Sequence, residues 1–181
     1  KGSSVTIMPD KRTIIGYTTK NSGGVPANFK NYFVLRFDHD FSFVGSIEDG
    51  KLSEGKTSAT GNHAMAVVGF RTKRGEQVNI QVASSFISDE QAQRNLKEVE
   101  GKTFDEVKSE GRKEWNNILG RIEVEDDNID HLRTFYSCLY RSVLFPRSFY
   151  EFDEQGNPIH YSPYNGKVLS GYLFTDTGFW D

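Results

Sequence analysis

Apolar and polar residues alternate with a period of two from Val5 to Phe86, which predicts a region rich in β-strands. The segments with the most β-branched and aromatic residues are the expected strands: residues 13–17, 32–37, 41–47, 64–70 and 78–86. Short polar turns at 38–40 and 72–76 join some of them. Because no helical period lies between these strands, the pattern favours an antiparallel sandwich or sheet over βαβ units.

The period changes to that of a helix after Ser88. Ser88 and Gln91 have the spacing of a capping box, in which the serine caps helix amides and the glutamine reaches back to the serine N–H. Apolar residues at helical spacing follow, and Gly101 is expected to end this helix.

A second capping box, Thr103 with Glu106, begins a longer helical pattern that Gly120 is placed to end. Residues 88–120 are therefore interpreted as a helical linker, whose charged residues form a solvated face.

Beyond the linker, the sequence predicts a short strand, a strong helix and an irregular segment. Residues 121–124 alternate briefly like a strand. Asp126 and Asp127 are expected to cap a helix that ends near Pro146. Residues 147–167 carry turn signals and no sustained period.

Composition narrows the range of partners. The 181 residues carry 22 basic and 25 acidic side chains, for a formal net charge of −3, and no basic stripe is present. This balance favours neither nucleic acid nor an anionic membrane. No stretch approaches the roughly 20 apolar residues of a membrane span, and no signal peptide is visible. The single cysteine, Cys138, cannot form an internal disulfide, and its helical apolar context favours a buried, inert thiol over a nucleophile.

Metal and nucleophile motifs are weak. Asp126, Asn128 and Asp130 resemble the start of a calcium loop, but the sixth position is His131 and the twelfth is Ser137, where glycine and glutamate are needed. Helix capping is the better account of these residues. The four histidines have no metal-ligand spacing with each other or with the cysteine.

The closing stretch, residues 175–181, carries the strongest candidate chemistry. An aromatic pair ending in Trp180 runs into Asp181, after Gly178, which lets the backbone turn. Aromatic faces cover the apolar C–H side of a pyranose, and a carboxylate accepts two hydroxyl donors. The alternative is a core edge beside a solvated acid. Asp176 and Asp181 could flank a glycosidic bond, but binding roles, or capping for Asp176, are preferred over a complete catalytic pair.

Five blocks follow one another along the chain: residues 82–91 (VASSFISDEQ), 104–115, 120–124, 135–147 (FYSCLYRSVLFPR) and 171–181. In this order they resemble the bacterial α-mannosidases of glycoside hydrolase family 92. The resemblance covers about residues 80–181, and the β-region before it has the right character with weaker motifs. Gly178-Phe179 stands where many members have Ser-Leu before Trp-Asp, so the aglycone preference stays open.

The resemblance implies a mainly β, antiparallel, supersandwich-like sandwich followed by linker helices and the first part of an (α/α)6 barrel. Residues 1–87 would form the N-terminal β-sandwich domain, partial or complete, 88–120 the helical linker, and 121–181 the truncated start of the catalytic domain. It also implies a calcium-dependent, inverting exo-α-mannosidase that releases terminal mannose from glycans, with α-1,2 linkages expected from family frequency. Trp180 would shape the apolar wall of the mannose subsite, and Asp181 would accept ring hydroxyls.

By the same resemblance, the catalytic acid, the catalytic base and the calcium ligands lie beyond Asp181. This segment would then hold no catalytic residue and no metal ligand, would be inactive alone, and would need the rest of the catalytic domain as a partner. The start at Lys1 and the end inside a motif agree with a fragment. The family implies a bacterial periplasmic, cell-surface or secreted protein. The alternatives are a non-catalytic carbohydrate-binding β-sandwich module and a structural or interaction module.

Overall fold

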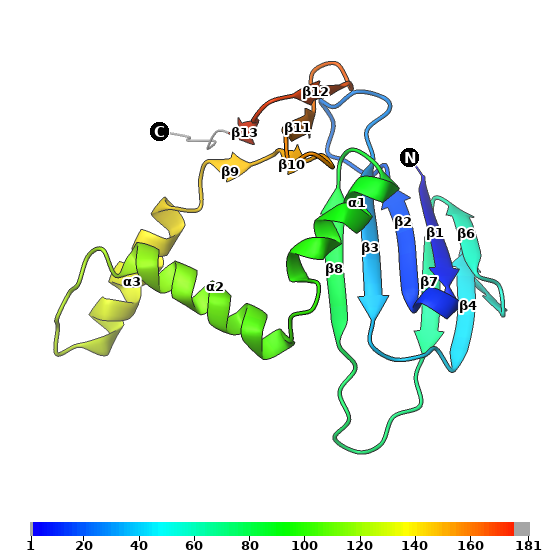
Figure 1. The fold of residues 1–181 in the computed structure, drawn as a ribbon, viewed down its shortest axis with the longest axis horizontal. Helices are drawn as coiled ribbons and strands as arrows, with labels where there is room; N and C mark the ends of the chain where they lie inside the picture. Colours follow the sequence, from blue (N-terminus) through cyan, green and yellow to red (C-terminus); the bar gives the residue numbers. More distant parts are fainter. Residues whose placement is uncertain (1, 176–181) are drawn as a thin grey trace. The chain divides into compact units, whose positions relative to one another are not determined.

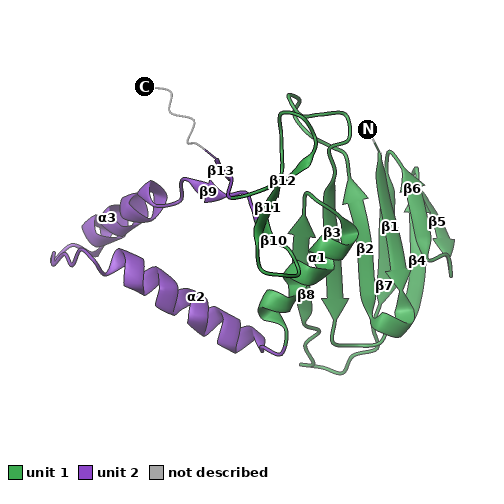
Figure 2. Cartoon of the chain, turned by 45° about the horizontal axis from the view of Figure 1, so that its top comes forward, with its two compact units in different colours: residues 1–100, 151–171 green, residues 101–150, 172–181 purple. Residues whose placement is uncertain are grey.

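The computed structural model describes residues 2–175, which fall into two compact units (Figure 2). Unit 1 comprises residues 1–100 and 151–171, and unit 2 comprises residues 101–150 and 172–181, as far as each is described. Antiparallel strands come first along the chain and helices follow, so the expected fold class is confirmed.

Unit 1 is built on a five-stranded antiparallel sheet in the order β6-β1-β2-β3-β8 (Figure 1). Its strands are β1 (Ser3–Met8), β2 (Thr13–Thr18), β3 (Asn31–Phe37), β6 (Ser58–Gly61) and β8 (Ile80–Ser85). Because successive side chains of a strand point to opposite faces, Ile14 and Ile15 enter two different clusters. Both faces of this sheet are therefore covered within unit 1.

One face packs on a three-stranded sheet in the order β5-β4-β7. Its strands are β4 (Phe43–Glu48), β5 (Lys51–Glu54) and β7 (Ala64–Gly69). Ile7, Ile14 and Phe37 are buried between the two sheets, together with half-buried residues that include Val44 and Val68. Each fully buried apolar side chain stabilises the unit by roughly 1.5–3 kcal/mol relative to an exposed one, and the half-buried ones by less. The two sheets form the predicted sandwich.

Helix α1 (Asp89–Asn95) and the 3-10 helix η2 (Leu96–Val99) cover the other face. Val34, Ala92 and Leu96 are fully buried there. Ser88 caps α1 by accepting the Gln91 N–H at 3.1 Å, as predicted. The other half of that capping box is wrong, because the buried Gln91 side chain is used elsewhere in the unit.

The 3-10 helix η1 (Pro9–Lys11) and a small sheet complete unit 1. The small sheet has the order β10-β11-β12, with β10 (Glu151–Phe152), β11 (Pro158–Tyr161) and β12 (Val168–Ser170). The prediction of an irregular segment over residues 147–167 is wrong here. These strands are very short, and contacts with residues far upstream support them.

Unit 2 contains α2 (Phe104–Leu119), α3 (Ile129–Ser142), β9 (Arg147–Ser148) and β13 (Phe174–Thr175). The predicted capping box of α2 is confirmed: Thr103 accepts the Glu106 N–H at 3.3 Å, and the Glu106 carboxylate accepts the Thr103 N–H at 2.7 Å. Gly120 ends the helix, also as predicted.

Neither α2 nor α3 has a buried residue, although each has one half-buried apolar side. The Trp115 and Tyr140 rings meet with centroids 4.6 Å apart. The strand predicted at 121–124 is wrong: these residues form no ladder with any other described segment. Within residues 2–175, the structure has no helix with the length and apolar character of a membrane span.

Candidate functional site

The predicted sugar-binding residues Trp180 and Asp181 lie outside the described residues, as do Asp176 and Gly178. The structure does describe the strand that leads to this tract. Backbone pairing holds it: β13 runs antiparallel to β9, with Phe174 opposite Ser148 and Thr175 opposite Arg147.

The ladder extends beyond the two strands, because the Phe149 N–H donates to the Leu173 carbonyl at 2.8 Å. The Arg147 N–H also donates to the Thr175 hydroxyl at 3.3 Å. The backbone entering the predicted tract is therefore fixed to the segment that follows α3.

An aromatic cluster of Tyr150, Tyr172 and Phe174 lies along this ladder. The Tyr150 ring meets the Tyr172 ring edge-on at 4.8 Å and the Phe174 ring edge-on at 5.5 Å, and Tyr172 and Phe174 stack at 6.4 Å. Tyr172 is 62% exposed and Phe174 is 52% exposed. Exposed ring faces can cover the C–H side of a pyranose, and tyrosine hydroxyls can bond to sugar hydroxyls. The cluster is thus suited to carbohydrate contact.

In unit 1, the small β10-β11-β12 sheet is bonded to the sandwich through Glu151. The Glu151 carboxylate accepts the Phe86 N–H at 3.0 Å and the Asn95 side-chain amide at 2.7 Å. Gln91, which is 2% exposed, donates to the Phe152 carbonyl at 2.7 Å and to the Asn95 amide oxygen at 2.9 Å. A buried, fully bonded amide fixes geometry because each unpaired partner would be costly.

The other end of the small sheet is bonded through Asn28. The Asn28 amide donates to the Gly166 carbonyl at 2.8 Å, and the Tyr161 hydroxyl donates to the Asn28 amide oxygen at 3.1 Å. Burial raises the pKa of the Tyr161 hydroxyl, so the group remains a protonated donor. Sequence reasoning missed these anchors, since each one joins positions more than 50 residues apart.

A cluster of three ionisable side chains in unit 1 joins the loop at residues 38–40 to the loop at residues 71–79. The His39 ring nitrogens bond to the Asp38 carboxylate at 2.5 Å and to the Glu76 carboxylate at 3.2 Å. The hydrogen bonds to Asp38 and then Glu76 raise the pKa of His39. The pKa of Glu76 is lowered, mainly by the hydrogen bond from the Lys73 backbone N–H and secondly by the one from His39. Partial desolvation raises the pKa of Asp38, but bonds from His39 and Asn79 outweigh it and leave that pKa lowered.

Within residues 2–175, no group of three or more His, Cys, Asp or Glu side chains is arranged to hold a metal ion. Asp126 and Asn128 instead accept backbone N–H groups at 2.7 and 3.0 Å. Asn128, rather than the predicted Asp126 or Asp127, is the N-cap of α3. The capping interpretation of this tract is therefore the right one, with a different residue as the cap.

The interpretation of Cys138 as a buried thiol is wrong. Its side chain is exposed, on a helix that has no buried residue.

Comparisons with known proteins identify the family. The model of the glycosyl hydrolase family 92 N-terminal domain matches residues 1–85. The model of the glycosyl hydrolase family 92 catalytic domain matches residues 91–181. An uncharacterized secreted glycosidase of Arthroderma benhamiae is 32% identical over 78 residues, which is 40% of this chain and 10% of that protein.

Solved structures agree with the family models. A family GH92 inverting mannosidase from Bacteroides thetaiotaomicron is 48% identical, with a TM-score of 0.93 over 99% of this chain and 24% of that one. A family GH92 α-mannosidase from the same organism, in complex with mannoimidazole, is 26% identical, with a TM-score of 0.78 over 97% of this chain and 23% of that one. This chain thus spans about a quarter of the length of these solved relatives. Two family models in the expected order and the match in fold show that the chain belongs to glycosyl hydrolase family 92.

Proposed function

We propose that this chain is part of an inverting exo-α-mannosidase, secreted or exposed at a cell surface, that releases terminal mannose from glycans. The observation that carries the proposal is the likeness, over nearly the whole chain, to a protein described as an inverting mannosidase. The secreted glycosidase relative supports an extracytoplasmic setting. The exposed aromatic cluster, which leads in sequence to the closing tract, supports a carbohydrate ligand.

The role of this chain in the proposed reaction is to bind and position the sugar. Trp180 would cover the apolar face of the terminal mannose, and Asp181 would accept its hydroxyl protons. Inversion requires a carboxylic acid that protonates the leaving oxygen and a carboxylate that activates water on the opposite face, about 6.5–9.5 Å apart. We assign both groups to the catalytic domain beyond residue 181, so the 181-residue chain alone would be inactive.

The proposed enzyme depends on calcium, which assists catalysis when bound. The described residues do not fit a calcium site, because they contain no suitable carboxylate cluster and the Asp126 tract is used for capping. The ion would be held by the rest of the catalytic domain. The binding roles proposed for Trp180 and Asp181 do not depend on the ion.

The direct test uses the full-length protein with α-1,2-, α-1,3- and α-1,6-linked mannobiose. Proton NMR should show β-mannose as the first product, with α-1,2-mannobiose cleaved fastest. A chelator should abolish the release of mannose, and added calcium should restore it. Absence of mannose release overturns the proposal, and α-mannose as the first product overturns inversion.

The predicted binding residues have their own test. Trp180→Ala should lower kcat/KM about 30-fold, or about 2 kcal/mol, whereas Trp180→Phe should lose much less because a ring face remains. Asp181→Asn should cost more than Trp180→Phe, because a hydrogen bond to an ionised group is stronger than one to a neutral amide. Unchanged kinetics in Trp180→Ala would remove this residue from the mannose subsite.

A further inference from the structure

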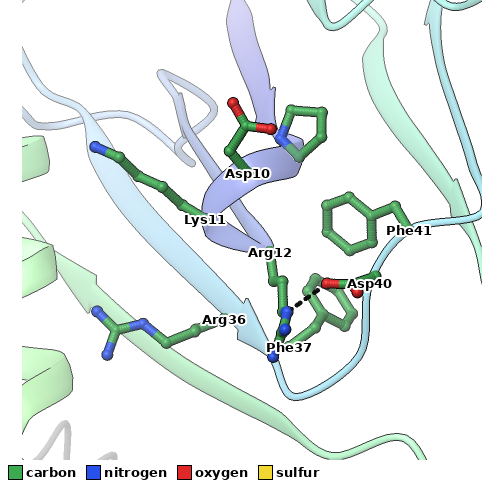
Figure 3. A pocket seen from close by; sticks show the side chains of 8 residues that line it. Asp10, Lys11, Arg12, Arg36, Phe37, Asp40 and Phe41 are labelled. Atoms are coloured by element: carbon green, nitrogen blue, oxygen red, sulfur yellow. Dashed lines mark hydrogen bonds and ion pairs between the residues drawn. The ribbon is translucent and has the colours of Figure 1, made fainter.

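Unit 1 has a shallow hollow of about 510 Å³ at the end of the sandwich where η1 leads into β2 and β3 leads toward β4 (Figure 3). Its lining includes Asp10, Lys11, Arg12, Arg36, Asp40 and Phe41, and we call it the Arg12 hollow. All of these residues belong to unit 1.

Arg12 is the fixed centre of this hollow. Its backbone is left-handed, with φ 51°, and its N–H and carbonyl are bonded to Pro9 and Phe37, each at 2.9 Å. The guanidinium donates to the Asp40 carboxylate at 2.6 Å and to the Asp38 carbonyl at 3.2 Å. A guanidinium has five N–H groups, so these two bonds leave donors for a ligand. The fork is therefore already oriented before anything binds.

The acceptor and the apolar surface lie beside Arg12. Figure 3 shows the Arg12 side chain extending toward Asp40, with Phe41 next to them. The Asp40 side chain is 83% exposed and can accept further hydrogen bonds. Phe41 is half-buried and packs edge-on against Phe37 at 5.3 Å and Phe70 at 5.7 Å. This packing holds the Phe41 ring in place at the hollow.

The charges of the Arg12 hollow nearly balance. Asp40 neutralises Arg12, and Glu100 lies 3.3 Å from Arg36, which leaves Lys11 and Asp10 as a further cation and anion. A phosphate or sulfate site would instead need an excess of cations with no carboxylate beside the ligand. Ionised donors and acceptors placed side by side next to an aromatic ring match the hydroxyls and the C–H face of a neutral sugar.

We propose that the Arg12 hollow is a surface subsite for a neutral sugar residue of a polysaccharide. The Arg12 guanidinium donates to one hydroxyl, the Asp40 carboxylate accepts from its neighbour, and Phe41 covers the apolar edge of the ring. Such a shallow, open site binds weakly on its own and acts by holding a long glycan near the enzyme. The choice of mannan as that glycan rests on the proposed function.

The test measures retardation of the full-length protein in a native gel containing soluble α-mannan, with a mannose-sized inhibitor saturating any catalytic subsite. Asp40→Asn and Arg12→Gln should each weaken mannan binding about tenfold, because each removes a charge-assisted hydrogen bond. Lys56→Gln is the matched control, since it removes one cation from the Lys56–Glu48 pair elsewhere on unit 1. Hydrolysis of a small aryl α-mannoside should stay unchanged in all three variants.

Parallel gels with dextran, and mannan gels with added inorganic phosphate at constant ionic strength, separate the ligand classes. Binding that phosphate abolishes, or that Asp40→Asn strengthens, overturns the proposal in favour of an anion site. Mannan binding equal to that of the parent protein in both Asp40→Asn and Arg12→Gln overturns it outright. Weakened polysaccharide binding in these variants supports the subsite even if the protein releases no mannose. The subsite and the proposed mannosidase activity can therefore be rejected independently of each other.

Discussion

In unit 1, Val34, Ala92 and Leu96 are almost completely buried, and both faces of the main sheet are covered. In unit 2, helices α2 and α3 each have apolar residues along one side but bury none of their residues. Two packed helices can cover only the side that each turns to the other. Unit 1 therefore has a core of its own among the described residues, whereas the described helices of unit 2 have capping bonds and ring contacts but no buried residue.

The largest expected effect tests this contrast with the same substitution in both units. Leu96→Ala should destabilise unit 1 by about 3 kcal/mol, because it opens a cavity under the sheet. Leu139→Ala, on the half-buried side of α3, should cost less than about 1 kcal/mol in this chain. Hydrogen exchange followed by mass spectrometry, read on β3 and α3 peptides, would measure each loss. Equal losses would show that the two units are packed alike.

A smaller effect is expected where the small sheet joins the sandwich. Gln91→Ala should lower the stability of β10-β11-β12 by about 2 kcal/mol, because the Phe152 carbonyl loses its buried donor. Gln93→Ala, on the exposed side of the same helix, is the control. Faster amide exchange in peptides from 151–171 should separate the two variants. Identical exchange would mean that Gln91 does not hold this sheet.

In unit 2, we expect the loss of a helix cap to lower helix stability more than the loss of a half-buried side chain does. Thr103→Ala removes half of the capping box and should destabilise the first turn of α2 by about 1 kcal/mol. Ser109→Ala, an exposed position inside the same helix, should be neutral or slightly stabilising. Helix content from circular dichroism would fall only in the first variant. A fall in both would argue against a specific role for the cap.

The smallest expected effect is a pH dependence of the loop pair joined by His39. The raised pKa of His39 stabilises the pair fully below about pH 6.5, and this contribution disappears as the pH rises through the raised value. The lowered pKa values of Asp38 and Glu76 add stability above about pH 4.5, which is lost as the pH falls through them. Protection of residues 71–79, corrected for intrinsic exchange, should therefore peak between these limits. His39→Gln should abolish the decrease at higher pH.

The sequence predicts elements whose stability comes from their own residues. The β-branched and aromatic residues of 13–17 predict a strand, and the Thr103–Glu106 box predicts a helix start, from local sequence alone. Edge strands β5 and β6 were missed because they are short and mostly polar, and ladder bonds to a neighbour define them. The strand expected at 121–124 has the right alternation but no partner strand among residues 2–175.

The candidate site also has a part that the sequence predicts and a part that depends on distant contacts. The blocks of sequence predict the family, and the comparisons confirm it. The Gln91 anchor could not be predicted, because a glutamine at the third position of a capped helix ordinarily points to the cap. Only the return of residues 151–171 to unit 1 gives this side chain a buried carbonyl to bond. The Arg12 hollow likewise depends on a loop conformation that brings Asp40 to Arg12 across 28 positions.

Unit 1 is discontinuous in sequence: the chain leaves it after Glu100 and returns to it over residues 151–171. During synthesis at the ribosome, its sandwich strands emerge first, but the carboxylate and carbonyl that pair with Asn95 and Gln91 arrive after both helices of unit 2 have been made. At roughly 5–20 residues per second, this delay lasts several seconds. During that interval the Gln91 amide has no Phe152 carbonyl to bond, so this part of unit 1 can be completed only after α2 and α3 have been translated.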